Sequence, residues 1–228
     1  MKKLFLVALI LCLPVMTLAA DEPAKESKAT DRIQAAADVL NEIESAPDAG
    51  IPEEVLGSSE CVAVVPSMLK GGFIVGAKYG RGLASCRTPK GWSAPAFFTV
   101  TGGSFGFQIG GSETDVVMAV MNRRGAEKLL QSKFTLGADA SVAAGPVGRT
   151  TSADTDAQMQ AEILTWSRAR GVFAGIALNG ATLRPDDDTN RELYGTVTSN
   201  REVIDHARPP AGSRELLDVL NRYSSHRG

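Results

Sequence analysis

The sequence predicts an α+β protein with a single domain, built on a strongly curved, mostly antiparallel sheet or small barrel with flanking helices. Three observations predict this class. Apolar residues recur at every second position through much of residues 61–183, as in strands with two unlike faces. Glycines repeat at even spacing within these strands. Helical spacing is limited to shorter segments, and no linker separates two cores.

The strand prediction is strongest where the alternation is longest. Apolar side chains alternate with small or polar ones in residues 72–79, 102–110 and 134–144. Arg170 and Gly171 suit a tight turn between two later strands. The remaining expected strands cover residues 61–65, 92–101, 114–121, 162–169 and 172–183.

Repeated glycines predict the curvature of the sheet. They stand four residues apart, at Gly72, Gly76 and Gly80, and again at Gly102, Gly106 and Gly110. Because strand glycines mark bulges, bends or close backbone approaches, their repetition favours a strongly curved sheet. Paired membrane helices with the GxxxG pattern are the alternative, but Lys78, Arg81 and Gln108 interrupt the apolar character.

Helices are expected before, within and after the strand region. Asn122 is a suitable N-cap for one helix, and the acidic residues 186–188 suit the N-terminal dipole of another. Capping explains these acidic residues better than a metal site does, since no further clustered ligands follow them. The expected helices cover residues 31–46, 51–56, 123–131 and 186–194, with an amphipathic helix after Ser213.

Residues 1–20 have the organisation of a secretory signal peptide. Two lysines precede the apolar run Leu4–Leu13, and small residues follow near Ala20. A membrane anchor is the alternative, but the run is shorter than the roughly 20 residues that span a bilayer. We therefore expect a periplasmic or secreted protein, peripheral to the membrane, with residues 21–30 as a flexible leader.

Charge and composition exclude several classes of function. A net charge of −2 over 228 residues gives no basic field for a nucleic acid. The 2 histidines leave little room for a zinc site or for histidine-based acid–base catalysis. We expect no cofactor, no metal and no nucleic-acid partner.

Export determines how the cysteines are interpreted. Cys12 is removed with the signal peptide, which leaves Cys61 and Cys86 as an even pair in an oxidising compartment. We predict a disulfide between them, and two buried free thiols are the alternative. Their separation, with no histidine nearby, argues against a metal site.

One short motif suggests an enzyme. Gly102–Gly106 fits the G-x-S-x-G pattern around Ser104, and Asp186 and His206 follow in the order of an α/β-type serine hydrolase. That motif requires a strand, a turn and a helix, whereas the alternation around Ser104 continues as a strand. A serine esterase is therefore the least favoured hypothesis, and we expect no enzyme activity.

Taken together, several segments resemble the SYLF lipid-binding domain family, which includes eukaryotic actin-patch proteins and many exported bacterial proteins. The resemblance covers about residues 31–195, and we treat 196–228 as a C-terminal helical extension packed on the domain. The matching segments are Lys70–Phe73, Gly80–Gly82, Gly91–Pro95, Gly102–Gly110, Glu113–Asp115, Leu136–Arg149, Gly171–Gly175 and Asn190–Gly195.

The resemblance implies phospholipid binding without catalytic residues. Family membership implies an anionic phospholipid or membrane surface as partner, and actin binding in some eukaryotic members. Because the signal peptide would place this chain away from actin, we expect an envelope membrane, with an envelope protein as a further partner. A structural or protein-interaction module that binds no lipid is the alternative.

Four cationic residues are the predicted lipid site: Lys70, Lys78, Arg81 and Arg149. Lys70, Arg81 and Arg149 lie in segments matching the family and beside glycine, and Lys78 lies on the same glycine-rich strand as Arg81. Glycine neighbours let an anionic headgroup reach backbone N–H groups as well as the side-chain charge.

Overall fold

The structure is a computed structural model that describes residues 23–45, 50–72, 75–105, 110–147, 160–169, 172–176, 178–196 and 199–222. The predicted signal peptide over residues 1–20 lies outside these residues, and so does Arg149.

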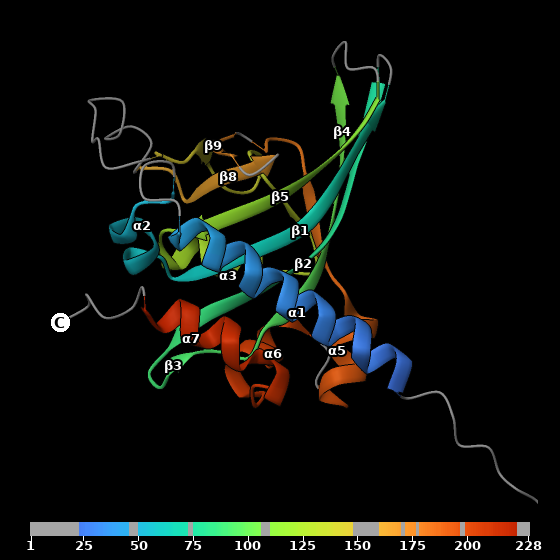
Figure 1. Cartoon of the computed structure of the whole chain (residues 1–228), viewed down its shortest axis with the longest axis vertical. Coiled ribbons are helices and arrows are strands. Elements are labelled where there is room, and N and C mark those ends of the chain that lie inside the picture. The colour runs from blue at the N-terminus through green and yellow to red at the C-terminus, as the bar shows by residue number, and fades with distance from the viewer. Residues whose placement is uncertain are drawn as a thin grey trace, which may run out of the picture.

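One strongly curled sheet forms the centre of the molecule (Figure 1). Its strand order is β6-β10-β4-β2-β1-β5-β8-β7, and β3 and β9 pair with β2 and β8 outside this path. The described strand pairings are antiparallel except β7 with β8. The strands are β1 (Cys61–Gly72), β2 (Val75–Thr88), β3 (Gly91–Trp92), β4 (Ala96–Phe105), β5 (Gly110–Val120), β6 (Phe134–Thr135), β7 (Val142–Ala144), β8 (Ile163–Ala169), β9 (Val172–Gly175) and β10 (Thr182–Pro185).

Helices flank the sheet, and α3, α5 and α6 begin at side-chain caps. The Asn122 side chain accepts a hydrogen bond from the backbone N–H of Gly125, and Asp186 accepts one from Thr189, so both predicted caps are confirmed. No helix in the described part of the chain is long and apolar enough to cross a membrane. The helices are α1 (Pro23–Glu44), α2 (Glu53–Ser58), α3 (Arg123–Leu129), α5 (Asp187–Tyr194), α6 (Asn200–His206) and α7 (Arg214–Arg222).

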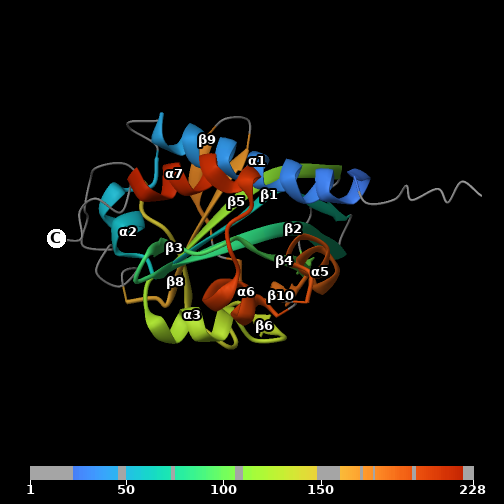
Figure 2. The same ribbon diagram turned by 90° about the horizontal axis from the view of Figure 1, so that it is seen from below.

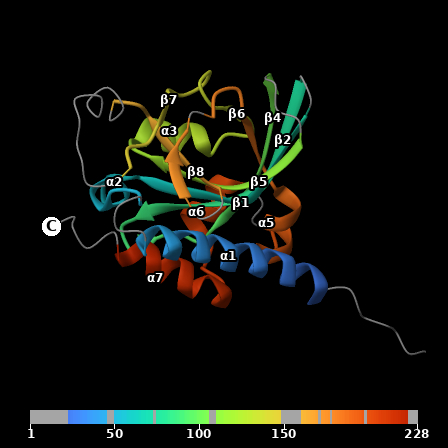
Figure 3. The same cartoon turned by 45° about the horizontal axis from the view of Figure 1, so that its top comes forward.

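Each face of the sheet has its own apolar core. On the outer face, α1, α2 and α7 pack against sheet residues that include Leu83, Phe97 and Trp166. On the inner face, α3, α6, β6 and β10 enclose a second cluster around Phe98, Met118 and their neighbours. Figure 2 shows the sheet between these two layers, and Figure 3 shows α1 and α7 side by side. The predicted α+β class with a curved, mostly antiparallel sheet is confirmed.

Several elements differ from their predicted extents, and the single strand expected over 172–183 is two strands, β9 and β10. Helix α1 begins at Pro23, so residues 23–30, expected in a flexible leader, are helical, and Ala29 is buried in the outer core. Residues 134–144 form only β6 and β7, because the chain turns at Gly137, where φ is +82°. Helix α6 was not predicted, although the capping box of Ser199 and Glu202 marks its start.

Cys61 and Cys86 form a disulfide that joins directly opposed positions of β1 and β2. Both sulfur-bearing residues lie in the inner core, 0% and 5% exposed. The bond therefore fixes the register of the two central strands at one end of the sheet.

Candidate functional site

Four central strands extend beyond the covered part of the sheet and form what we call the arm (Figure 1). The arm consists of residues 69–72, 75–80, 101–105 and 110–114 in strands β1, β2, β4 and β5. The outer neighbours stop at its base, since β10 pairs with β4 only from Phe98 to Thr101 and β8 pairs with β5 only from Asp115 onward. The rest of the sheet is called the body.

The register assigns each arm residue to one of the two faces. Val100 and Val116 belong to the inner core, so the alternate residues further out on β4 and β5 continue that inner face. Lys70 lies opposite Lys78 on one side and opposite Ser112 on the other, and Lys78 lies opposite Gly102. These four residues form one row across the inner face, which we call the lysine row.

The two lysines are electrostatically unfavourable neighbours. Directly opposed like charges on adjacent strands destabilise a sheet. Burial, and secondly the charge of Lys78, lower the pKa of Lys70. Among the described residues, neither ammonium group forms an ion pair or a hydrogen bond. The arrangement favours an anion as the missing counter-charge.

An unpaired hydroxyl lies one row closer to the body on the same face. Thr114 is opposite Met68, is 8% exposed, and its Oγ1 has no hydrogen-bond partner within the described part of the chain. Most buried hydroxyls are hydrogen-bonded, so an unpaired one requires an explanation. Gly80, in the neighbouring strand, packs against Met68 and leaves this row without a bulky side chain from β2.

The outer face of the arm is more apolar and more exposed. Leu69 and Tyr79 lie opposite each other there and are 55% and 44% exposed. Arg81 lies two residues along β2 from Tyr79, and its Nε donates a hydrogen bond of 3.0 Å to the Tyr79 hydroxyl. This bond is the main reason that the pKa of Arg81 is raised.

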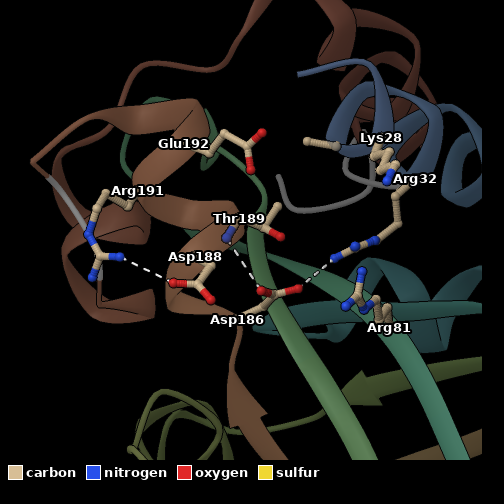
Figure 4. Close-up of a pocket in the computed structure, with 9 residues that line it drawn as sticks. Lys28, Arg32, Arg81, Asp186, Asp188, Thr189, Arg191 and Glu192 are labelled. Carbon is tan, nitrogen blue, oxygen red and sulfur yellow. Dashed lines mark hydrogen bonds and ion pairs between the residues drawn. The ribbon is translucent and has the colours of Figure 1, made fainter. Parts of the chain in front are cut away.

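Arg81 also lines a pocket of about 510 Å³ between α1, α5 and β2 (Figure 4). Figure 4 shows the Arg32 and Arg81 side chains near the carboxylate of Asp186. Arg32 forms an ion pair of 3.1 Å with Asp186 and stacks over the ring of Phe97 at 5.3 Å. The pocket residues are Lys28, Ala29, Arg32, Arg81, Asp186, Asp188, Thr189, Arg191 and Glu192.

The predicted lipid site is therefore divided. Lys70 and Lys78 are brought together on the inner face of the arm, whereas Arg81 lies on the opposite face, in the pocket. The prediction for Arg149 falls outside the described residues.

A charged cluster joins the base of the arm to α1. Arg168 binds the Asp115 carboxylate through Nε at 2.8 Å and also contacts Glu42 of α1. The other oxygen of Asp115 accepts a hydrogen bond of 2.9 Å from the backbone of Ser67, where φ is +51° and β1 bulges. Burial is the main cause that raises the pKa of Asp115. The cluster fixes where the arm begins.

The alternative of a serine esterase is not supported by the local structure. Ser104 lies inside β4, opposite Gly76 of β2, and not at a turn between a strand and a helix. Its expected partner Asp186 is bound to Arg32. Within the described ranges, no three His, Cys, Asp or Glu side chains gather as a metal site would require.

Sequence reasoning missed Ser112, Thr114 and Arg32. Ser112 and Thr114 alternate in step with Gly110 along β5, but the strands were expected at 102–110 and 114–121, so the shared face of these residues was not predicted. Arg32 carried no such signal, because the packing of α1 against α5 and β2 brings it to Asp186.

Comparison with known proteins identifies the family. Residues 101–223 match the family model described as Ysc84, Las17-binding protein actin regulator. The chain is 33% identical over 182 residues to SH3 domain-containing YSC84-like protein 1 of Xenopus laevis, which covers 78% of this chain and 54% of that protein. The human protein of the same name is 32% identical over 181 residues, covering 78% and 53%.

Fungal relatives show a similar likeness. LAS seventeen-binding protein 3 of Saccharomyces cerevisiae is 31% identical over 179 residues, covering 76% of this chain and 39% of that protein. The chain spans about half the length of the first vertebrate relatives it matches. The match to the family model includes the C-terminal helices α6 and α7. The resemblance to SYLF proteins is thus confirmed, and the chain belongs to the Ysc84 family.

Proposed function

We propose that this protein is an exported, non-catalytic phospholipid-binding protein that acts at the surface of an envelope membrane. The observation that carries the proposal is the opposed pair Lys70 and Lys78 on a half-buried, glycine-rich face with no acidic partner among the described residues. An anionic headgroup between the two ammonium groups would relieve their repulsion.

The expected contribution of Lys70 and Lys78 to the binding free energy is large enough to measure. A lysine near an anionic membrane surface contributes about 1 kcal/mol, so two contribute about 2 kcal/mol, or roughly thirtyfold in affinity. The arm also extends away from α1 and α7, which leaves its far end clear of the helical layer (Figure 3). Arg149 and Arg81 stay in the proposal as further cationic contacts, each to be tested separately.

The location is part of the same proposal. The organisation of residues 1–20 supports export, and the disulfide between Cys61 and Cys86 suits an oxidising compartment. We propose that the mature protein is periplasmic or secreted and peripheral to the membrane.

The test is co-sedimentation with phosphatidylglycerol vesicles. The variant Lys70→Ala plus Lys78→Ala is expected to bind about thirtyfold more weakly than the parent. Added salt is expected to weaken binding by the parent. The matched control is Lys90→Ala plus Lys133→Ala, which removes the same charge from two exposed positions outside the arm and should bind as the parent does. Equal, salt-insensitive binding by both double variants would refute the proposal.

A second candidate is protein interaction in the context of actin regulation. The family description names a Las17-binding actin regulator, and the exposed pair Leu69 and Tyr79 offers an apolar contact on the outer face. The expectation that actin is not a partner therefore receives no support from the comparisons. Co-sedimentation with filamentous actin tests it, and Leu69→Ser is expected to reduce any such binding. An envelope protein at the same surface is the corresponding partner for an exported chain.

A further inference from the structure

We propose that the inner face of the arm contains a discrete site for a phosphate group, formed by Lys70, Lys78, Ser112 and Thr114. The inference rests on the proposed function, because both use the lysine pair. It adds that one phosphate group binds at a defined place, where two hydroxyls act together with two ammonium groups. The phosphate can belong to a lipid headgroup or to a free phosphate compound.

The register places these four side chains on neighbouring positions of one face. Ser112, Lys70 and Lys78 are consecutive members of the lysine row, and Thr114 follows Ser112 on the same face of β5. Directly opposed residues have Cβ atoms about 5 Å apart. A phosphate group over Lys70 therefore lies within reach of side chains from three strands.

The hydroxyl of Thr114 is the observation that separates a discrete site from diffuse attraction to a charged surface. Its Oγ1 is buried and has no hydrogen-bond partner among the described residues. It lies on the face of Lys70 and Lys78, and neither lysine has a counter-charge within the same part of the chain. A phosphate group has several strong acceptor oxygens, so it can accept from a hydroxyl and two ammonium groups at once. Lysine side chains are long and flexible, so Lys70 can shift to admit the anion.

Small residues leave room for the phosphate group, and the segment before β10 bounds one side of the site. Gly102 ends the lysine row opposite Lys78, and the next row toward the end of the arm holds only glycines and Ser104. A side chain at Gly102 would meet the backbone of Ala181 at 3.2 Å, so the segment before β10 closes the site on that side.

The test uses a substitution that changes no charge. Thr114→Val keeps the side-chain volume and removes the hydroxyl, and Thr101→Val is the control on the exposed outer face. Calorimetric titration with inorganic phosphate and with glycerophosphoglycerol is expected to show binding by the parent and by Thr101→Val. Thr114→Val should bind the probes about tenfold more weakly, since it loses one hydrogen bond to a charged acceptor. Ser112→Ala, at an exposed position, is a second variant with the same expected direction.

Thermal unfolding gives an independent readout. The ligand-free Thr114→Val protein is expected to melt at the temperature of the parent or above, because valine has no unpaired hydroxyl to bury. A lower melting temperature together with unchanged affinity for the probes would give Thr114 a purely structural role and overturn the inference.

The remaining outcomes separate the inference from the proposed function. Tighter binding of glycerophosphoglycerol, with competition by phosphatidylglycerol vesicles, would identify a lipid headgroup as the ligand. Equal binding of inorganic phosphate without vesicle binding would support the site and refute the lipid function. Vesicle binding that depends on the lysines, without binding of either soluble probe, would support the lipid function and overturn the discrete site.

Discussion

The body and the arm are two ends of the same strands, and they differ in what covers them. In β1, Cys61 to Val65 are buried, with the outer and inner cores on alternate residues. Beyond the bulge at Ser67, Leu69 and Gly71 of the same strand are exposed. The body therefore supplies the stability of the fold, and the arm presents a charged inner face and an apolar outer face.

Glycine has a different role in each region. In the body, a Cβ at Gly82 would lie 2.6 Å from the carbonyl oxygen of Val64 and 2.7 Å from Cζ of Phe98. In the arm, a Cβ at Gly71 or Gly103 would meet nothing within 4 Å. The body glycines allow backbone and ring to approach closely, whereas these arm glycines leave the outer surface smooth.

The largest expected effect on stability comes from removing the disulfide in the body. Cys61→Ala plus Cys86→Ala removes a bond between residues 25 apart in sequence, so the free energy of unfolding should fall by about 3 kcal/mol in the chain-entropy model. Urea denaturation measures this change. Affinity for phosphatidylglycerol vesicles should stay within about twofold of the parent, because the arm is unchanged.

Two results would contradict the assignment of stability to the disulfide-bonded body and of vesicle binding to the arm. Native, oxidised protein whose two cysteines are freely alkylated would show that the bond does not form. A matching loss of vesicle affinity in the folded variant would show that the arm depends on the disulfide.

Glycine substitutions give the next largest effect. Gly82→Ala should lower the free energy of unfolding by about 2 kcal/mol, because its Cβ collides with the backbone of Val64 and the ring of Phe98. The matched variant Gly71→Ala should change it by less than about 0.5 kcal/mol, since that position is open. Thermal or urea unfolding of the two variants side by side is the measurement. Equal destabilisation by both would remove the distinction between body and arm.

Much of the fold was predictable because it follows from local patterns. The two-residue alternation gave the central strands, and Asn122 and Asp186 gave two helix starts. The alternation failed at 134–144, where Gly137 turns the chain and the tertiary contacts of β6 and β7 decide their short lengths. Helix α1 already begins at Pro23, and Ala29 is buried in the outer core, a tertiary contact that no local signal in the sequence shows.

The candidate site was predictable only in part. Lys70 and Lys78 were chosen for their glycine-rich strands, and the hairpin register of β1 with β2 brings them together. The same reasoning placed Arg81 with them, although an odd separation along a strand puts Lys78 and Arg81 on opposite faces. Thr114 has no distinguishing pattern in sequence, since its importance lies in a hydroxyl left unpaired by burial.

The smallest expected effect concerns Arg81, which directly follows the arm on β2 and lies on the outer face of the sheet. Arg81→Ala removes one cation from the outer face, where Nε is already bonded to the Tyr79 hydroxyl and the carboxylate of Asp186 lies near. One basic residue at a membrane surface contributes about 1 kcal/mol at most, so vesicle affinity should fall less than fivefold. Co-sedimentation beside the Lys70→Ala plus Lys78→Ala variant gives the direct comparison. If Arg81→Ala weakened binding as much as the lysine pair does, the outer pocket and not the inner face would be the main contact with lipid.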